Sequence, residues 1–255
     1  MNKIPDRSIA VFSSKPAMDG VVFEEWQAVC EEAVRRSGRF AAVLSGGRTP
    51  VSFYERLARA GQDLPWEKTH IFQADERLVP ADHPASNMRM IERKLLRRVP
   101  IPKGNIHPVP VGLGPRPAAL AYEKELRAFF GLRERERPRF DLVLLGLGED
   151  GHTASLFPGD EALAETRRLA VVVTRPEPDH DRVSLTLPAI NAAHVVIFMV
   201  AGENKAAALK AVLEGPEEAP PAARVRPRQG RSVFLADKGA ARLLASPPRL
   251  TRMLP

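Results

Sequence analysis

The alternation of short apolar runs with segments of helical periodicity constrains the fold of this chain more than any other feature. The apolar runs lie at residues 8–14, 40–45, 69–75, 140–148, 169–174, 194–202 and 232–237. After the first run, Val22, Trp26 and Ala33 keep the spacing of one helix face. Strands that are apolar on both faces and separated by helices are typical of a parallel sheet covered on both sides. The pattern predicts an α/β fold with a doubly wound, mostly parallel sheet flanked by helices on both faces, in a three-layer α/β/α arrangement.

Local signals add detail to this prediction. A helix is expected after the run at 69–75, with an apolar side formed by Met88, Ile91, Leu95 and Val99. Asp237 can cap a terminal helix. The segment at 214–230 is rich in Pro and Gly and is predicted to be a surface excursion. Cys30 adjoins the first apolar helix face, which predicts a buried structural thiol.

Length and composition indicate one globular domain over residues 1–255. Hydrophobic residues make up 44% of the chain and charged residues 27%, which is ordinary for a folded protein. No apolar run approaches the roughly 20 residues of a membrane helix, and the N-terminus lacks a secretory signal pattern, so no membrane partner is expected. The single cysteine excludes an internal disulfide and favours a reducing cytoplasm. We expect a monomer or a weak homo-oligomer.

The net charge of +7 raises the question of a nucleic-acid partner. The one dense basic cluster, "RERERPR" at 133–139, alternates with glutamates. Such alternation is typical of a solvated helix end and connector, so no nucleic-acid partner is expected. A preference for anionic small molecules agrees equally well with the charge.

Glycines at 146, 148 and 151 give the stretch "LGLGEDGHTASLFPG" the G-x-G-x-x-G spacing of a dinucleotide-binding turn. Glu149 and Asp150 lie inside that turn and would repel a pyrophosphate. The next apolar run ends in Thr174 and Arg175 instead of the acidic residue that would hold the ribose. The motif also lies in the middle of the chain, whereas a dinucleotide-binding unit normally opens its domain. We therefore expect no such cofactor.

The same stretch favours acid–base chemistry. A histidine titrates near neutrality, so His152 can take a proton from water and return it to a leaving group. Asp150, two residues away, can fix its tautomer, and Gly151 allows a loop tight enough for the two side chains to meet. A lone histidine is more often structural, but its position after an apolar strand favours a functional one.

The stretch "LSGGRTP" at 44–50 predicts an anion site. A Ser45-Gly46-Gly47 turn at a helix N-terminus can present backbone N–H groups to an oxyanion. Thr49 suits the N-cap and Pro50 the first helical position. A tight turn without a ligand is the alternative for this motif alone. The G-K-[ST] element of a nucleotide P-loop is absent.

Three adjacent charges, Asp75, Glu76 and Arg77, follow the apolar run at 69–73. Charges at a strand end are costly to bury without partners, so they indicate either a site or a structural Arg–carboxylate pair. His70, Asp75 and His83 match no compact metal-ligand spacing, and no metal site is expected. Farther along, Arg182 precedes one short strand and Lys205 begins a helix. Together they could reach one phosphate, although each alone resembles a solvated surface cation.

Taken together and in this order, several segments resemble the motifs of the 6-phosphogluconolactonase family. They are "SGGRTP", "DERLVPADHPASN", "LGLGEDGHTASLFPG", "RVSLTLPAINAA" and "GENKA". The resemblance extends from about Phe40 to Asp237. It implies hydrolysis of 6-phosphogluconolactone to 6-phosphogluconate, the second step of the oxidative pentose phosphate pathway, without a cofactor or a metal.

This resemblance leads to a hypothesis for the site. The substrate phosphate would bind the Ser45-Gly46-Gly47 turn with Thr49, Arg182 and Lys205. His152 would take a proton from the attacking water, and Arg77 or loop N–H groups would hold the oxyanion. Asp75 and Asp150 would orient His152 or the water, and the division between them stays open.

Two alternatives have distinct sequence signatures. The related glucosamine-6-phosphate deaminases continue their Asp-Gly-His loop with Asn-Glu, whereas Leu156 and Phe157 stand here. A non-catalytic sugar-phosphate sensor of this fold would carry a DNA-binding helix pair. The roughly 40 residues before the SGG motif are too few for one and begin with a strand.

Overall fold

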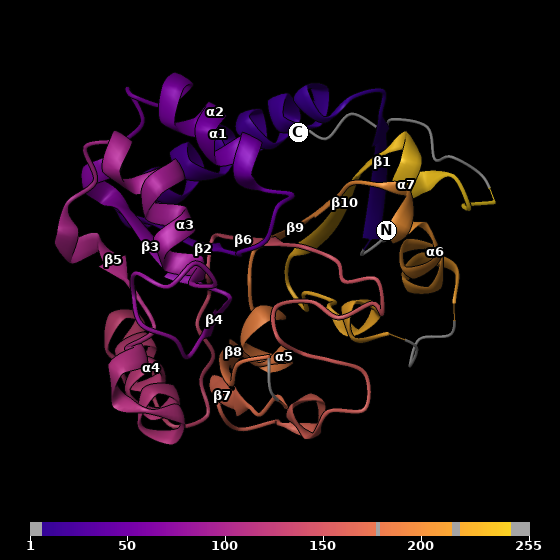
Figure 1. The fold of residues 1–255 in the computed structure, drawn as a ribbon. Helices are drawn as coiled ribbons and strands as arrows, with labels where there is room; N and C mark the ends of the chain where they lie inside the picture. Colours follow the sequence, from indigo (N-terminus) through magenta and orange to yellow (C-terminus); the bar gives the residue numbers. More distant parts are fainter. Residues whose placement is uncertain (1–6, 177–178, 216–219, 246–255) are drawn as a thin grey trace.

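The computed structural model describes residues 7–176, 179–215 and 220–245, and its largest element is a parallel sheet (Figure 1). The strand order is β1-β10-β9-β6-β2-β3-β5, and every neighbouring pair in it is parallel. The strands are β1 (Arg7–Phe12), β2 (Phe40–Leu44), β3 (Thr69–Gln73), β5 (Ile106–His107), β6 (Leu142–Leu145), β9 (Val195–Val200) and β10 (Arg231–Asp237). The prediction of an α/β fold with a mostly parallel sheet is confirmed.

Helices cover both faces of this sheet, as Figure 1 shows. One face packs against α1 (Lys15–Ser37), α2 (Val51–Ala60) and α3 (Asn87–Lys94). The other packs against α4 (Pro115–Phe130), α5 (Leu187–Ile190) and α6 (Ala206–Glu214), with α7 (Lys238–Ala241) near the β1 edge. Short 3-10 helices lie between these elements: η1 (Trp66–Lys68), η2 (Leu96–Arg98), η3 (Lys103–Asn105), η4 (Val111–Leu113), η5 (Glu161–Ala164), η6 (Glu203–Lys205) and η7 (Pro221–Arg224).

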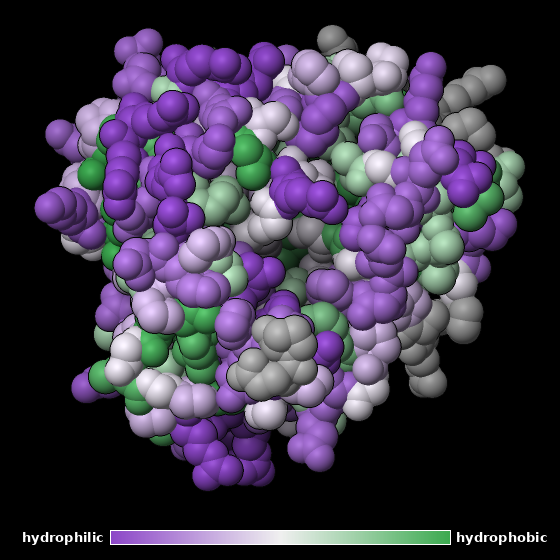
Figure 2. Space-filling view, viewed as in Figure 1, coloured by the Kyte–Doolittle hydropathy of each residue, from purple (hydrophilic) through white to green (hydrophobic). Residues whose placement is uncertain are grey.

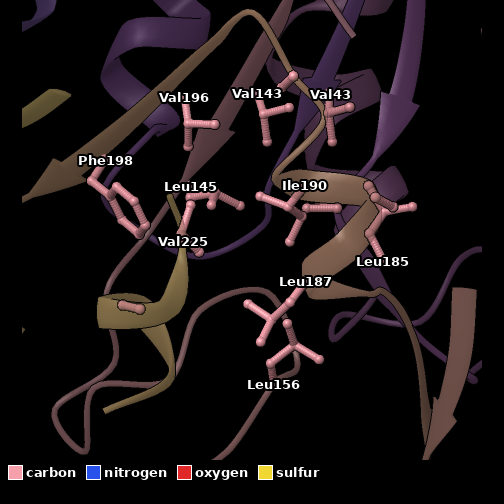
Figure 3. Packing of buried hydrophobic residues seen from close by; sticks show 14 of the residues in the cluster. Val43, Val143, Leu145, Leu156, Leu185, Leu187, Ile190, Val196, Phe198 and Val225 are labelled. Carbon is pink, nitrogen blue, oxygen red and sulfur yellow. The ribbon is translucent and has the colours of Figure 1, made fainter. Parts of the chain in front are cut away.

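The central strands β2, β6 and β9 are apolar throughout because each side-chain row faces one of two cores. In β9, Val196 and Phe198 belong to the core beneath α4 and α5, whereas Ile197 points to the core beneath α1 and α2. In Figure 3, Val143 and Val196 project from neighbouring strands toward the region of Ile190. Side chains alternate across a strand with a period of two, so burial on both faces requires a continuous apolar run.

The α1 helix is defined at both ends by its sequence. The Ser14 side chain accepts a hydrogen bond from the Ala17 N–H at the start, and Gly38 ends the helix in the left-handed conformation. Trp26 and Cys30 on its inner face are fully buried. The prediction of a buried thiol is confirmed, as is the Asp237 cap, whose side chain accepts a bond from the Ala240 N–H.

The apolar run at 169–174 departs from the expected parallel sheet. Its strand β7 (Ala170–Val173) pairs antiparallel with β8 (Arg182–Leu185), which pairs antiparallel with β4 (Asp75–Arg77). Ala170 and Val173 at its ends are buried in the apolar core, and Val171 and Val172 between them are half-buried against the same core. A short apolar run does not distinguish an antiparallel strand packed in this way from a buried parallel strand.

Two other predictions need correction. The helix after β3 ends at Lys94, because Leu95 leaves helical geometry with φ −132° and ψ −68° and a 3-10 turn follows. Val99 is extended and only packs at the edge of the core. The segment at 214–230 is not wholly a surface excursion, since Ala222, Ala223 and Val225 are buried in the core. Residues 216–219 of that segment lie outside the described residues.

Among the described residues, no helix combines the length and the apolar character that crossing a membrane would require.

Candidate active site

The strand order fixes where a site can form. From β2 the chain continues outward to β3 and β5, whereas β6, on the other side of β2, leads to β9 and β10. The loops that follow β2 and β6 therefore separate at the carboxyl end of the sheet, the position where open α/β sheets bind ligands. The hydroxyl of Ser45, directly after β2, donates to the carbonyl of Leu144 in β6 at 2.7 Å, which holds the two strand ends together.

A cavity of about 650 Å³ opens at this point. Figure 2 shows the molecule hollowed near the centre of the same view, with mainly hydrophilic residues around the opening. The structure brings every predicted site residue except Asp150 to the wall of this cavity: Ser45, Gly46, Gly47, Thr49, Asp75, Arg77, His152, Arg182 and Lys205. Asp150 does not line the cavity, but it contacts His152 from behind.

His152 and Asp150 form the closest acid–base pair of the site. Asp150 Oδ1 lies 2.6 Å from His152 Nδ1 and also accepts the backbone N–H of His152 at 3.0 Å. Partial burial raises the pKa of Asp150, but the hydrogen bonds from His152 outweigh this and lower it below its usual value. An ionised carboxylate can only accept, so Nδ1 of the neutral imidazole carries the hydrogen and Nε2 is the basic nitrogen.

Two glycines make room for this pair. A Cβ on Gly148 would lie 2.1 Å from His152 Nδ1 and 2.6 Å from Asp150 Oδ1. Gly151 has φ +80°, and a Cβ there would lie 2.2 Å from Pro220 Cβ. The chain beyond Pro220 also holds the loop from outside, because the Ala222 N–H donates to the Gly151 carbonyl at 3.0 Å.

The chain directly after His152 does not form a helix. Thr153 and Leu156 instead form an isolated antiparallel bridge, and Ala154 between them adopts φ +49°. This turn sends Phe157 back under the imidazole, with the two ring centroids 4.4 Å apart. The guanidinium of Arg175 lies 4.1 Å from the centroid of the same phenyl ring.

The turn after β2 presents free donors to the cavity. Within the described chain, the backbone N–H groups of residues 46–49 donate no hydrogen bond, and Gly47 has φ +86°. Gly46 is required by Asn87, because a Cβ would lie 1.8 Å from the Asn87 amide oxygen. The prediction that Thr49 caps the next helix is wrong. Pro50 precedes α2, and no side chain caps it.

Asp75 and Arg182 line the cavity and are linked through the buried Ser155. The Ser155 hydroxyl donates to Asp75 Oδ2 at 2.7 Å, and Arg182 Nη1 lies 3.5 Å from that hydroxyl. Arg182 Nη2 also donates to Asp179 at 2.6 Å. The Nε atoms of Arg77 and Arg182 are buried and have no hydrogen-bond partner. Buried side-chain donors without a partner are uncommon in folded proteins.

Glu76 has a structural role, and it does not pair with Arg77. It is 1% exposed, and its carboxylate accepts bonds from the Asn87 and Met88 N–H groups at the start of α3, both at 2.7 Å. It also accepts hydrogen bonds from the Gln73 amide, the Ser86 hydroxyl and the backbone N–H of Arg77. The Arg77 guanidinium donates to the Ala85 carbonyl instead. A carboxylate at a helix N-terminus is favoured by the exposed N–H groups and the helix dipole.

We expect Glu76→Gln to lower the free energy of unfolding by about 2 kcal/mol, because the amide turns one acceptor into a donor facing other donors. Chemical denaturation measures this change. Glu67→Gln on an exposed 3-10 turn is the matched control and should leave stability unchanged. Equal stability of the two variants would contradict the assigned role of Glu76.

Sequence reasoning missed several residues that line the cavity: Lys15, Arg48, Ser52, Asn87 and Asn204. Lys15 follows β1 and contacts both Asp19 and the Ser52 hydroxyl. Its position three residues after the end of β1 was the available signal, since the other site segments also follow strands. Ser155 gave no such signal. Its importance rests on a contact with a residue 80 positions earlier.

Metal ligands are not gathered anywhere in the described ranges, where no three His, Cys, Asp or Glu side chains are arranged to hold an ion. His70 points away from Asp75 and contacts His107, with 3.1 Å between Nδ1 and Nε2. Burial, followed by the charges of His107 and Arg39, lowers the pKa of His70 to about 4.

His70 should make the fold sensitive to acid. Its unfolded pKa is about 6.5, so the unfolded chain binds the extra proton between pH 6.5 and 4. Its contribution to stability is present above pH 6.5 and is lost as the pH falls toward 4. We expect the free energy of unfolding of His70→Gln to decline less over this range than that of the wild type. Parallel declines in denaturant titrations would contradict this assignment.

Residues 13–234 match the model of the family described as glucosamine-6-phosphate isomerases/6-phosphogluconolactonase. The chain belongs to this family. It is similar to a 6-phosphogluconolactonase of Synechocystis, with 46% identity over 213 residues that cover 82% of this chain and 86% of the relative.

Other members of the family extend the match. A 6-phosphogluconolactonase of Rattus norvegicus is 41% identical over 253 residues, which cover 94% of both chains. The solved structure of a 6-phosphogluconolactonase from Trypanosoma cruzi superposes with a TM-score of 0.85 at 34% identity, covering 94% of this chain and 97% of the other. The family resemblance expected from the sequence motifs is thus confirmed.

Proposed function

We propose that this chain hydrolyses 6-phospho-D-glucono-1,5-lactone to 6-phospho-D-gluconate, the second step of the oxidative pentose phosphate pathway. The observation that carries the proposal is one cavity that holds a carboxylate-oriented imidazole beside unpaired cationic and backbone donors. The names of the family relatives support the same reaction.

The phosphate end of the substrate would bind the N–H groups of residues 46–49 together with Ser45, Thr49, Arg182 and Lys205. Among these donors, the N–H groups of residues 46–49 have no partner in the described chain, so a dianion there would satisfy them. Binding energy from the phosphate, remote from the reacting carbon, would then orient the lactone ring over His152.

His152 would act as the general base and then as the general acid. Its Nε2 takes a proton from water, the water oxygen bonds to C1, and the carbonyl electrons move onto the oxygen. As the carbonyl re-forms, the bond from C1 to the ring oxygen breaks, and His152 returns the proton to that oxygen. The new acid ionises to 6-phosphogluconate. Arg77, with its unpartnered Nε, or the loop N–H groups would hold the oxyanion.

The two aspartates would divide the orienting work. Asp150 would orient His152 and stabilise the imidazolium, since Asp150 Oδ1 lies 2.6 Å from His152 Nδ1. Asp75 would instead orient the water and fix Arg182 through Ser155, with which it shares a hydrogen bond. These contacts support the proposed division of roles.

The deaminase alternative finds less support. In this chain Leu156 is fully buried and Phe157 packs on the imidazole, so neither position supplies the acid that serves ring opening. A non-catalytic sugar-phosphate binder would not require a histidine oriented by a carboxylate at the cavity wall. The presence of this pair therefore favours an enzyme over a binding protein.

We also propose that residues 1–255 act as one domain, in the cytoplasm, as a monomer or a weak homo-oligomer and without a metal. Support for one domain comes from the core beneath α4 and α5, which joins β7 and β8 to the main sheet. The lone buried cysteine supports a reducing compartment.

An assay with freshly prepared lactone tests the reaction. We expect 6-phosphogluconate to form faster than by spontaneous hydrolysis, at a rate that EDTA does not lower, and no ammonia to form from glucosamine 6-phosphate. A rate equal to the spontaneous background would remove the proposal, and ammonia release would favour the deaminase.

A further inference from the structure

A second cavity, of about 550 Å³, lies at the opposite end of the sheet from the candidate active site. Its wall is made by segments that precede β6, β9 and β10, which places it at the amino ends of these strands. Five arginines line it: Arg135, Arg137, Arg139, Arg224 and Arg228. Three of them come from the "RERERPR" segment, which the sequence suggested was only a solvated connector.

The charge of these arginines is left without a matching carboxylate. In the described residues none of the five forms an ion pair, and the one acidic side chain in the wall is Glu165. Its Oε1 already accepts the N–H groups of Arg167 and Arg168. The cavity is therefore strongly positive.

Neutral partners nevertheless hold several of the guanidinium groups in place. Arg137 donates to the carbonyls of Arg135 and Thr166, and Arg224 donates to the carbonyl of Leu163 at 3.0 Å. Arg139 donates to the Gln229 side chain at 3.1 Å. Bonds to carbonyls orient a guanidinium without cancelling its charge, so the donors are preorganised for an anion.

His194, directly before β9, contacts one of these arginines. His194 Nδ1 lies 3.2 Å from Arg139 Nη2. Burial, followed by the charges of Arg139 and Arg36, lowers the pKa of His194 to about 4. A neutral imidazole beside Arg139 adds no further positive charge, and its Nδ1 can accept a hydrogen bond from that guanidinium.

The floor of the same cavity is apolar. Leu163, Leu187, Pro188 and Ala192 contribute to it. A ligand that suits both parts carries several negative charges at one end and a flat apolar group at the other. Arginine guanidiniums also stack on aromatic rings, which adds to the preference for a planar group.

We propose that this cavity binds a nucleotide, with its phosphates on the arginines and its base on the apolar floor. Its volume lies within the range of small-molecule sites. The inference is independent of the reaction at the other end of the sheet, because the two cavities share no lining residue.

Calorimetric titration with Mg²⁺-free ATP tests the proposal, at an ionic strength of about 0.15 M to screen non-specific attraction. We expect one ATP per chain, bound at least about tenfold more tightly than tripolyphosphate, because only ATP has a base to stack. Absence of ATP binding would overturn the proposal. Equal affinities for the two anions would overturn it as well, since the site would then recognise charge alone.

Paired variants locate the site. Arg135→Gln/Arg228→Gln removes two exposed arginines whose side chains make no hydrogen bond within the described residues, and it should weaken ATP binding at least about tenfold. Arg59→Gln/Arg93→Gln makes the same charge change on α2 and α3 and should leave binding unchanged. Loss of binding in Lys205→Gln, with none in the Arg135/Arg228 variant, would move ATP to the active-site cavity and refute the proposal. None of these readouts uses lactone hydrolysis.

Discussion

Replacing His152 with alanine is expected to lower kcat for lactone hydrolysis by about 100- to 10,000-fold, the usual loss when a general acid–base group is removed. Binding of 6-phosphogluconate should persist, because the proposed phosphate donors lie on the turn after β2 and on Arg182 and Lys205. Initial rates corrected for spontaneous hydrolysis give kcat, and calorimetry gives product affinity.

Asp150→Asn keeps the imidazole and changes only its carboxylate partner, so its kcat can be compared with that of His152→Ala. The amide oxygen can still accept the Nδ1 hydrogen of His152, but it no longer stabilises the imidazolium by charge. Its loss in kcat should therefore be smaller than that of His152→Ala. Near-normal turnover in His152→Ala would dismiss His152 as the base, and loss of product binding together with turnover would point to a general disruption of the cavity.

Much of the site could be predicted because of one geometric rule. In a parallel sheet the carboxyl ends of all strands meet at one edge, so polar and glycine-rich segments that follow strands come together. The turn at Ser45, the charges at Asp75 and the loop at His152 each follow a strand and line one cavity. The rule needs only the order of apolar runs and loops, which the sequence provides.

The failures share a different cause. Glu76 was a candidate for chemistry, yet its carboxylate serves the N–H groups of residues 87 and 88, a pairing that only the folded chain shows. Ser155 reaches Asp75 across 80 positions, and β7 joins an antiparallel sheet instead of the parallel one. Local pattern reports which face is apolar. It does not report which partner covers that face or accepts a given hydrogen bond.

The G-x-G-x-x-G spacing illustrates the same limit in one motif. The sequence excludes a pyrophosphate from this turn by charge, but it does not say what each glycine is for. In the structure, Gly148 faces the His152–Asp150 pair and Gly151 faces Pro220. The spacing thus serves a histidine loop, where a missing Cβ makes room for an imidazole.

Gly148→Ala should consequently be nearly as damaging to turnover as loss of the imidazole itself. The new Cβ would lie 2.1 Å from Nδ1 of His152 and 2.6 Å from Asp150 Oδ1, so the ring must turn away and lose its carboxylate. We expect kcat to fall about 100-fold, since misplacing a catalytic group by about 1 Å can have that effect. KM for the lactone should change little, because the proposed phosphate site is not displaced.

The fold should survive this substitution, since Gly148 does not adopt a positive φ and the 30% exposed His152 side chain can rotate into the open cavity. Gly104→Ala is the matched control, because a Cβ there meets no atom within 4 Å. Its kcat and melting temperature should equal those of the wild type. If Gly148→Ala kept wild-type turnover, the imidazole would not need its bond to Asp150, and the orienting role proposed for that carboxylate would fail even with His152 retained as the base.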